Sequence, residues 1–391
     1  MKNSYLKKLL ILIALFLPAT LAVHAQTDDL LNVLIKKNVI TQQEADSLRS
    51  DAAIKAQAKK DQEAKNALPG VGFGKYLRVG GVLQERYQGF AQSTKFNSFD
   101  LHRARLIIQG NVTDDWSYYT QTELAGGSVK AIDIYTTYKI ADYLKFSAGQ
   151  MKIPFSLESL QSDPALEFID RSQVVEALAG RSTDVISTTG VGTAAAPGNQ
   201  QGRDIGIQIN GSFFKLNNTY LVDYTFGVFN GAGYDVTADN NSRKDLGGRL
   251  AIHPIKDLTI GADFYNGVAW YGNPAKNTKR NRGGFDARYV IGGLSVQAEY
   301  DKGTDGSIKR DGYYGQAAYF VLPKKLQLAA KYDSYDPNKA IGTDRANIYT
   351  GGVNYFFNNW AKFTVDYLIR HEEATTQIKN NIIEAQLQLT F

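Results

Sequence analysis

From Lys75 to the last residue, hydrophobic and polar positions alternate with a period of two, which is the pattern of β-strands with one apolar face. In the last segment, Ile383, Leu387 and Leu389 share one face, while Glu384 and Gln386 share the other. A shift by one residue would put the carboxylate on the apolar face, so the register is well determined. The pattern predicts sixteen strands, over about 75–89, 100–112, 116–125, 130–140, 143–151, 204–211, 218–229, 245–253, 258–267, 283–291, 294–301, 311–321, 326–333, 346–356, 360–370 and 381–391.

The connections between these strands alternate in length. The short ones are 113–115, 141–142, 292–293, 322–325 and 357–359. The longer, polar ones are 90–99, 230–244, 268–282, 334–345 and 371–380. Short turns on one rim, long loops on the other and an even strand number are typical of an outer-membrane barrel. The sequence therefore predicts an all-β fold, a 16-stranded antiparallel transmembrane β-barrel over residues 75–391.

The first 25 residues have the pattern of a signal peptide. Lys2, Lys7 and Lys8 precede the apolar run 9–17, and small residues stand before Gln26. An uncleaved membrane helix is the alternative, but the run is too short for one and Pro18 interrupts it. We expect cleavage after residue 25 and a protein of the bacterial outer membrane.

Residues 26–66 are helical in pattern and precede a linker over 67–74. Thr41 to Glu44 form a capping box, and Ala45, Leu48 and Ala52 follow at a/d-like spacing. Three copies of such a segment could pair as a short coiled coil in the periplasm. A flexible polar spacer and a contact to the cell wall remain alternatives.

Composition excludes several kinds of chemistry. The chain has no Cys, which excludes disulfides and thiolate ligands, and three of its four His residues follow the signal peptide on distant strands. We expect no metal site and no cofactor. The formal charge of +5 includes the three signal-peptide lysines and is too balanced to indicate a nucleic-acid partner. Aromatic residues make up 12% although mean hydropathy is only −0.30, as alternating strands require.

Several segments, in order along the chain, resemble motifs of the phosphate-selective porin O and P family. They are Asp100–Leu106, Gly149–Glu158, Phe168–Ser172, Gly202–Gly206, Gly227–Gly231 and Asp245–Leu250. The resemblance implies a sixteen-stranded, usually homotrimeric porin in outer-membrane lipid whose fifth strand leads into a loop folding inward. The terminal Phe391 resembles the C-terminal signal that the barrel assembly machinery reads.

The connection 152–203 is far longer than an ordinary loop, which indicates a functional role. We expect it to fold into the lumen as a constriction loop. The charges of this loop and of the inward wall positions are mixed, so neither sign dominates. The candidate pore-lining or solute-contacting residues are Arg78, Arg86, Arg103, Arg105, Lys152, Arg171, Arg203 and Arg249. Two roles stay open for the arginines of the first two strands: tying the loop to the wall, or contacting the solute.

The best functional interpretation is a non-enzymatic porin for passive diffusion of small hydrophilic solutes or ions, including anions such as phosphate. One alternative is a structural or adhesive barrel with a blocked lumen. A second is an outer-membrane barrel hydrolase, which would need a Ser-His pair on adjacent lipid-facing positions that the predicted register does not supply.

Overall fold

The computed structural model describes residues 36–37, 71–73, 75–179, 202–216, 219–233, 236, 238–271, 276–373 and 379–391. The predicted signal peptide (1–25) and, apart from Lys36 and Lys37, the predicted helical segment (26–66) lie outside this set, as does most of the linker. Those interpretations therefore stay predictions. Within the described residues, no helix has the length and apolar character needed to cross a membrane.

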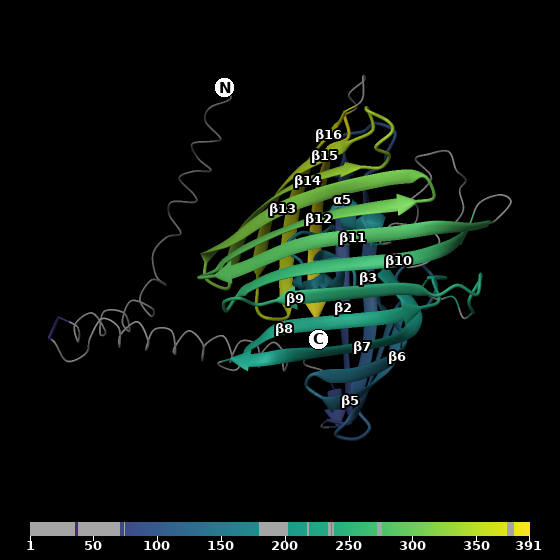
Figure 1. The fold of residues 1–391 in the computed structure, drawn as a ribbon. Coiled ribbons are helices and arrows are strands. Elements are labelled where there is room, and N and C mark those ends of the chain that lie inside the picture. The colour runs from purple at the N-terminus through teal and green to yellow at the C-terminus, as the bar shows by residue number, and fades with distance from the viewer. Residues whose placement is uncertain are drawn as a thin grey trace, which may run out of the picture. The chain divides into compact units, whose positions relative to one another are not determined.

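Sixteen antiparallel strands close into a barrel (Figure 1), which confirms the predicted fold. Each strand pairs with the next along the chain, and β17 pairs with β2 to close the ring. The strands are β2 (Leu77–Phe90), β3 (Ser98–Asn111), β4 (Trp116–Glu123), β5 (Lys130–Ala141), β6 (Leu144–Lys152), β7 (Arg203–Leu216), β8 (Thr219–Phe229), β9 (Asp245–Ile252), β10 (Leu258–Tyr271), β11 (Lys276–Ile291), β12 (Leu294–Asp305), β13 (Ile308–Leu322), β14 (Leu326–Asp336), β15 (Ala346–Phe356), β16 (Ala361–Glu372) and β17 (Ile382–Thr390).

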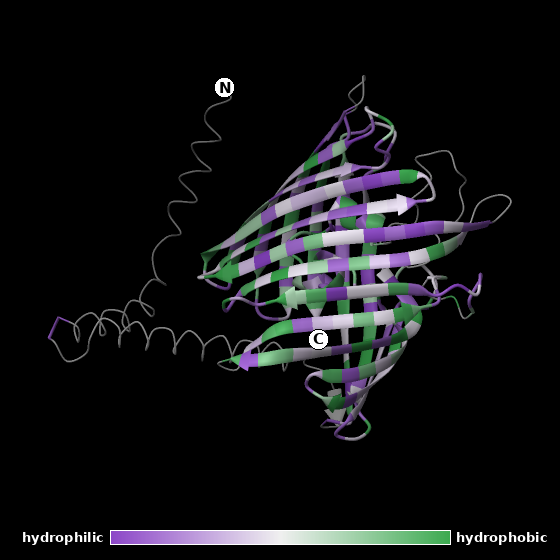
Figure 2. Ribbon diagram, in the orientation of Figure 1, coloured by the Kyte–Doolittle hydropathy of each residue, from purple (hydrophilic) through white to green (hydrophobic). Residues whose placement is uncertain are grey.

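The two faces of the wall have opposite character. In β17 the side chain of Glu384 is 1% exposed and faces the lumen, whereas Ile383 is 45% exposed on the outside. Figure 2 shows the same alternation of polar and apolar residues along most strands. Apolar side chains outside suit a lipid surround, and polar ones inside suit a water-filled or polar lumen.

Several strands extend further toward the long-loop rim than the sequence predicted. β11 begins at Lys276 instead of 283, β12 ends at Asp305 instead of 301, and β13 begins at Ile308 instead of 311. The predicted long loop 268–282 is therefore wrong, because only 272–275 separates β10 from β11. Near this rim both faces of the wall are polar, so the hydropathy no longer alternates although the hydrogen-bonded ladder continues.

The short-turn rim is built from tight hairpins. Gly292 and Gly293 join β11 to β12 with φ values of 55° and 88°. Two consecutive residues with positive φ fit the twist of a two-residue hairpin, and glycine adopts them without steric cost. This turn was predicted from the glycine pair and lies where the sequence placed it.

The seam of the barrel joins the two ends of the ladder. Gly81 donates to and accepts from the backbone of Phe391, at 2.8 and 3.0 Å. Beyond the end of β17, the short strand β1 (Val71–Phe73) continues the pairing along β2. A Cβ on Gly81 would stand 2.6 Å from the carbonyl oxygen of Arg105 and 2.5 Å from the Phe391 ring.

Gly81→Ala should therefore destabilise the barrel by about 1–3 kcal/mol, because the backbone oxygen cannot move away from the new methyl group. The midpoint of heat-induced loss of the folded form on gels measures this change. Gly315→Ala is the matched control, since a Cβ there meets no atom within 4 Å. Equal midpoints for the two variants would contradict this account of the seam.

The described part of the connection between β6 and β7 contains three short helices: α4 (Leu157–Leu160), the 3-10 helix η1 (Asp163–Ala165) and α5 (Gln173–Leu178). Val174, Val175 and Leu178 of α5 are buried in one apolar cluster with Tyr265 and Tyr314 of the inner wall. The segment 153–179 therefore packs against β10 and β13 through a small hydrophobic core of its own.

Candidate functional site

Wall carboxylates bind backbone N–H groups of the inserted segment. Glu299 of β12 accepts hydrogen bonds from the N–H groups of Leu157 and Glu158, both at 3.1 Å, at the start of α4. Asp366 of β16 accepts from Ile169 at 2.8 Å. These N–H groups would otherwise be buried without partners, which is costly. Acidic wall positions thus anchor the segment.

Wall cations and amides bind the carbonyl groups of the same segment. The Lys362 ammonium group donates to the carbonyl oxygen of Leu166 at 2.8 Å. Lys331 donates to the carbonyl oxygen of Asp170 at 2.9 Å, and Asn354 donates to that of Glu167 at 2.8 Å. The wall carries charges of both signs because the backbone of the inserted segment presents both N–H donors and carbonyl acceptors.

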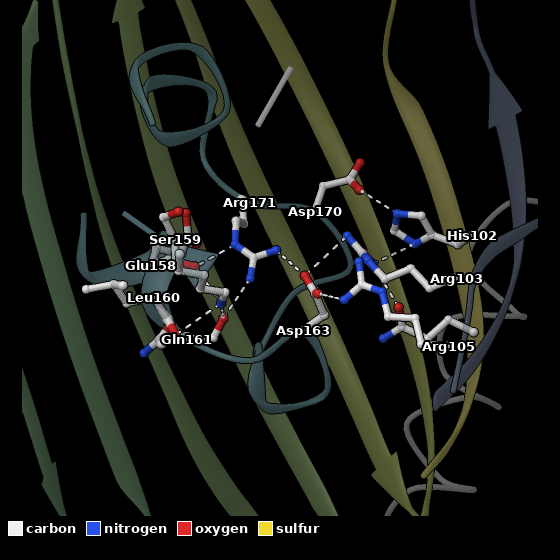
Figure 3. A network of polar contacts seen from close by, with 12 residues as sticks. His102, Arg103, Arg105, Glu158, Ser159, Leu160, Gln161, Asp163, Asp170 and Arg171 are labelled. Carbon is white, nitrogen blue, oxygen red and sulfur yellow. Dashed lines mark hydrogen bonds and ion pairs between the residues drawn. The ribbon is translucent and has the colours of Figure 1, made fainter. Parts of the chain in front are cut away.

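Asp163 of η1 lies among Arg103 and Arg105 of the wall strand β3 and Arg171 of the inserted segment (Figure 3). We call these four residues the Asp163 cluster. Arg105 and Arg171 each pair directly with the carboxylate, and Arg103 approaches it to 3.5 Å. Arg105 also pairs with Glu123 at 2.9 Å. The cluster ties the inserted segment to β3.

A β-bulge helps to direct these side chains. Gln84 pairs with Arg103 and the next residue, Glu85, pairs with Leu101, so His102 is the extra residue on β3. As a result, His102 and Arg103 both reach lumen partners: His102 lies 2.7 Å from Gln386, and Arg103 donates to Gln84 at 2.8 Å. Bulges commonly re-aim side chains at functional sites.

Arg171 remains charged in its buried place. Burial lowers the pKa of Arg171, but the neighbouring Asp163 carboxylate outweighs this effect, so the pKa lies above its ordinary value. The guanidinium also donates to the carbonyl oxygens of Glu158 at 3.0 Å and Gln161 at 2.9 Å. All of these contacts are within the inserted segment, so Arg171 mainly fixes the shape of that segment.

An open cavity of about 570 Å³ remains in the lumen on the side away from the apolar cluster. The wall strands β3, β5 and β16 and the inserted segment border it. Its cationic lining residues are Arg103, Arg105, Lys130, Arg171 and Arg370. Its acidic lining residues are Glu123, Asp170 and Glu176. Cations therefore outnumber carboxylates around the cavity.

The remaining candidate residues lie apart from this cavity or serve other contacts. Arg86 pairs with Asp100 at 2.7 Å and borders Asp170 at 3.4 Å. Lys152 donates to the carbonyl oxygens of Ser159 and Gln161, both at 2.8 Å, at the end of α4. Arg203 binds Asp133 at 2.8 Å. Arg249 binds Asp263 at 2.8 Å and Asp286 at 2.7 Å. Arg78 is exposed near the short-turn rim.

The sequence did not single out a second arginine cluster on the wall. Arg280, Arg282 and Arg310 surround the buried carboxylate of Asp305 at 2.9–3.3 Å. All three arginines fell in predicted loops. The signal that could have found Arg280 and Arg282 is their period-two alternation with Asn281 and Gly283, which continues the pattern of β11.

Solved structures with a similar fold are bacterial outer-membrane proteins. The anion-selective porin from Comamonas acidovorans matches with a TM-score of 0.60 and 12% identity, over 81% of this chain and 99% of that one. Salmonella typhi OmpF, solved in complex with daunomycin, matches with a TM-score of 0.59 and 14% identity, over 81% and 97% of the two chains. The channel DcaP of Acinetobacter baumannii matches with a TM-score of 0.54 and 13% identity, over 83% and 100%.

These identities are low, so the likeness bears on the fold. No curated protein matches the sequence. The family model described as phosphate-selective porin O and P matches residues 78–391, which is the whole of the closed barrel. The chain is thus a passive-diffusion channel of the bacterial outer membrane and belongs to the phosphate-selective porin O and P family.

Proposed function

We propose that small anions, phosphate among them, pass through the lumen along the cavity beside the Asp163 cluster. The observation that supports this path is the excess of cationic over acidic side chains around the 570 Å³ cavity. Rings or ladders of Arg and Lys favour anions in pores. The apolar cluster of α5 packs against Tyr265 of β10 and Tyr314 of β13, whereas β3, β5 and β16 border the cavity.

The cations differ in how free they are to meet a solute. Arg105 and Arg171 are occupied by Asp163, so they act mainly as tethers in this proposal. Lys130 and Arg370 line the same cavity, and no carboxylate of the described residues forms an ion pair with either side chain. We propose Lys130, Arg370 and the less tightly held Arg103 as the solute contacts. In this proposal, one set of residues ties the inserted segment to the wall and a different set contacts the solute.

The double substitution Lys130→Gln with Arg370→Gln tests this path. Because it removes two cations that pair with no carboxylate of the described residues, the reversal potential in a KCl gradient should shift toward cations. Single-channel recordings in planar bilayers measure the shift. Lys324→Gln with Lys325→Gln, on the exposed turn between β13 and β14, is the control and should leave the potential unchanged.

An unchanged reversal potential in the double variant would contradict the proposed anion path. A correctly inserted protein that conducts no current would instead favour the structural or adhesive barrel with a blocked lumen. We propose further that the chain has no catalytic activity, since the family it belongs to is one of diffusion channels.

We also propose the assembly expected from the sequence. One similar solved structure, OmpT of Vibrio cholerae, is described as a trimer form, and we propose a homotrimer for this chain as well. β2 begins at the short-turn rim, which supports a periplasmic place for the segment before it. Phe391, whose backbone completes the seam, is the proposed recognition residue for the barrel assembly machinery.

A further inference from the structure

A groove of about 340 Å³ lies on the wall at the long-loop rim of β11, β12 and β13. Its lining includes Gly283, Tyr300, Lys302, Lys309 and Lys339. We call this the outer basic groove. It is separate from the lumen and from the proposed solute path.

The strand register places the groove on the outer face. Arg280, Arg282 and Arg310 are buried and point inward to Asp305, so the residues next to them point outward. Across the strands, Gly283 pairs with Lys302, and Thr304 pairs with Lys309. Gly283 keeps the groove hollow, because a Cβ there would meet only the end of the Lys302 side chain, at 3.7 Å, and a backbone oxygen at 4.0 Å.

An aromatic row fixes the depth of the groove relative to the membrane. Phe285, Tyr300 and Tyr313 are cross-strand neighbours and are 64%, 40% and 42% exposed. Aromatic belts lie at the level of the lipid headgroups. Lys302 is two residues further toward the long-loop rim than Tyr300, or about 7 Å along the strand. The lysines therefore stand at or just above the headgroups of the outer leaflet, where Figure 2 shows a polar end of β11.

The positive charge of the groove is largely unmatched. Lys302 and Lys309, and Lys279 beside them on β11, form no ion pair with any carboxylate of the described part of the chain. The one carboxylate that lines the groove among the described residues, Asp311, is already occupied by Lys339 and by Arg345, the latter at 3.2 Å. Lys302 and Lys309 line the hollow and Lys279 stands beside it on β11, so three ammonium groups that pair with no described carboxylate are complementary to an anion that has several acceptor oxygens.

We propose that the outer basic groove binds the phosphorylated headgroup of an outer-leaflet glycolipid. Lys279, Lys302 and Lys309 pair with the phosphate, and the Thr304 hydroxyl group donates a hydrogen bond to the headgroup, while the Tyr300 hydroxyl donates to Asp311 at 3.5 Å. The acyl chains lie along the exposed aromatic row below. A lipid fits better than a soluble anion because the groove opens toward the membrane and its lower border is apolar.

Binding of diphosphoryl lipid A to the full-length chain in phosphatidylcholine nanodiscs tests the proposal, with native mass spectrometry as the readout. The triple variant Lys279→Gln, Lys302→Gln, Lys309→Gln should bind the lipid about tenfold more weakly or worse, since each lysine near a membrane surface contributes to attraction of anionic lipid. The control variant Lys215→Gln, Lys324→Gln, Lys325→Gln carries the same charge change near the short-turn rim and should bind like the unmodified chain. Single-channel conductance verifies that each variant is folded.

Two further measurements identify the source of the phosphate. Enzymatically dephosphorylated lipid A should bind as weakly to the unmodified chain as lipid A binds to the triple variant. Millimolar inorganic phosphate should leave lipid A bound. Equal binding by the triple variant, an equal loss in the control variant, equal binding of dephosphorylated lipid, or displacement by inorganic phosphate would each overturn the proposal.

Discussion

Asp163→Asn will loosen the inserted segment and increase anion preference more than any other single substitution in the lumen. Asp163 is buried and is the carboxylate shared by Arg105 and Arg171, with Arg103 at 3.5 Å. The asparagine side chain has nearly the same shape as the aspartate side chain but carries no charge. Breaking a buried ion pair on one side costs about 3 kcal/mol or more, because the remaining charges lose their partner.

Thermal unfolding of the purified barrel and the reversal potential in a KCl gradient measure the two effects. The unfolding midpoint should fall, and the reversal potential should move toward that of chloride, since Arg103 and Arg171 then face the cavity without the Asp163 charge, while Arg105 keeps Glu123. Asp142→Asn is the matched control, because Asp142 pairs with Lys139 on the exposed turn between β5 and β6. If the Asp163 variant unfolds and conducts like the Asp142 variant, the Asp163 cluster does not hold the segment.

Deleting residues 160–198 will raise the single-channel conductance at least about twofold, because a sixteen-stranded wall encloses an aqueous channel once nothing fills it. The deletion removes η1 and α5, and with α5 the Val174, Val175 and Leu178 side chains of the apolar cluster. It leaves the strand ladder complete. Larger sugars should then enter liposomes that contain the variant, as swelling assays measure.

A short deletion in a loop outside the lumen provides the control. Residues 93–95 lie in the exposed connection between β2 and β3, and their removal should change neither conductance nor size exclusion. Unchanged conductance in a correctly inserted 160–198 deletion would show that the inserted segment does not narrow the pore.

The sequence predicted the strands and their faces well because every second residue of a strand faces lipid and must therefore be apolar. The register of β17, with Glu384 inside and Ile383 outside, could be read directly from the chain. Strand ends were less predictable. At Lys276 to Arg282 both sides of the wall are polar, so the charged run has the composition of a loop although it forms the start of β11.

The roles of individual charges could not be predicted, since a list of residues does not say which charges pair. Arg203 was a candidate solute contact, yet it binds Asp133 across the wall. The bulge at His102 interrupts the alternation of inward and outward side chains, and no residue type in the motif predicts a bulge there. Lys130 was not selected because it stands at the first position of β5, where inward and outward faces are hardest to distinguish.

The way the wall holds the inserted segment also bears on how such channels can diversify. Glu299, Asp366 and Lys362 bind main-chain N–H and C=O groups of the segment, which every residue type except proline supplies. Substituting a side chain at Leu157, Leu166 or Ile169 therefore leaves these anchors intact. Selection can vary the chemistry that a passing solute meets while the anchoring of the segment stays constant, so new selectivities need not be accompanied by a new scaffold.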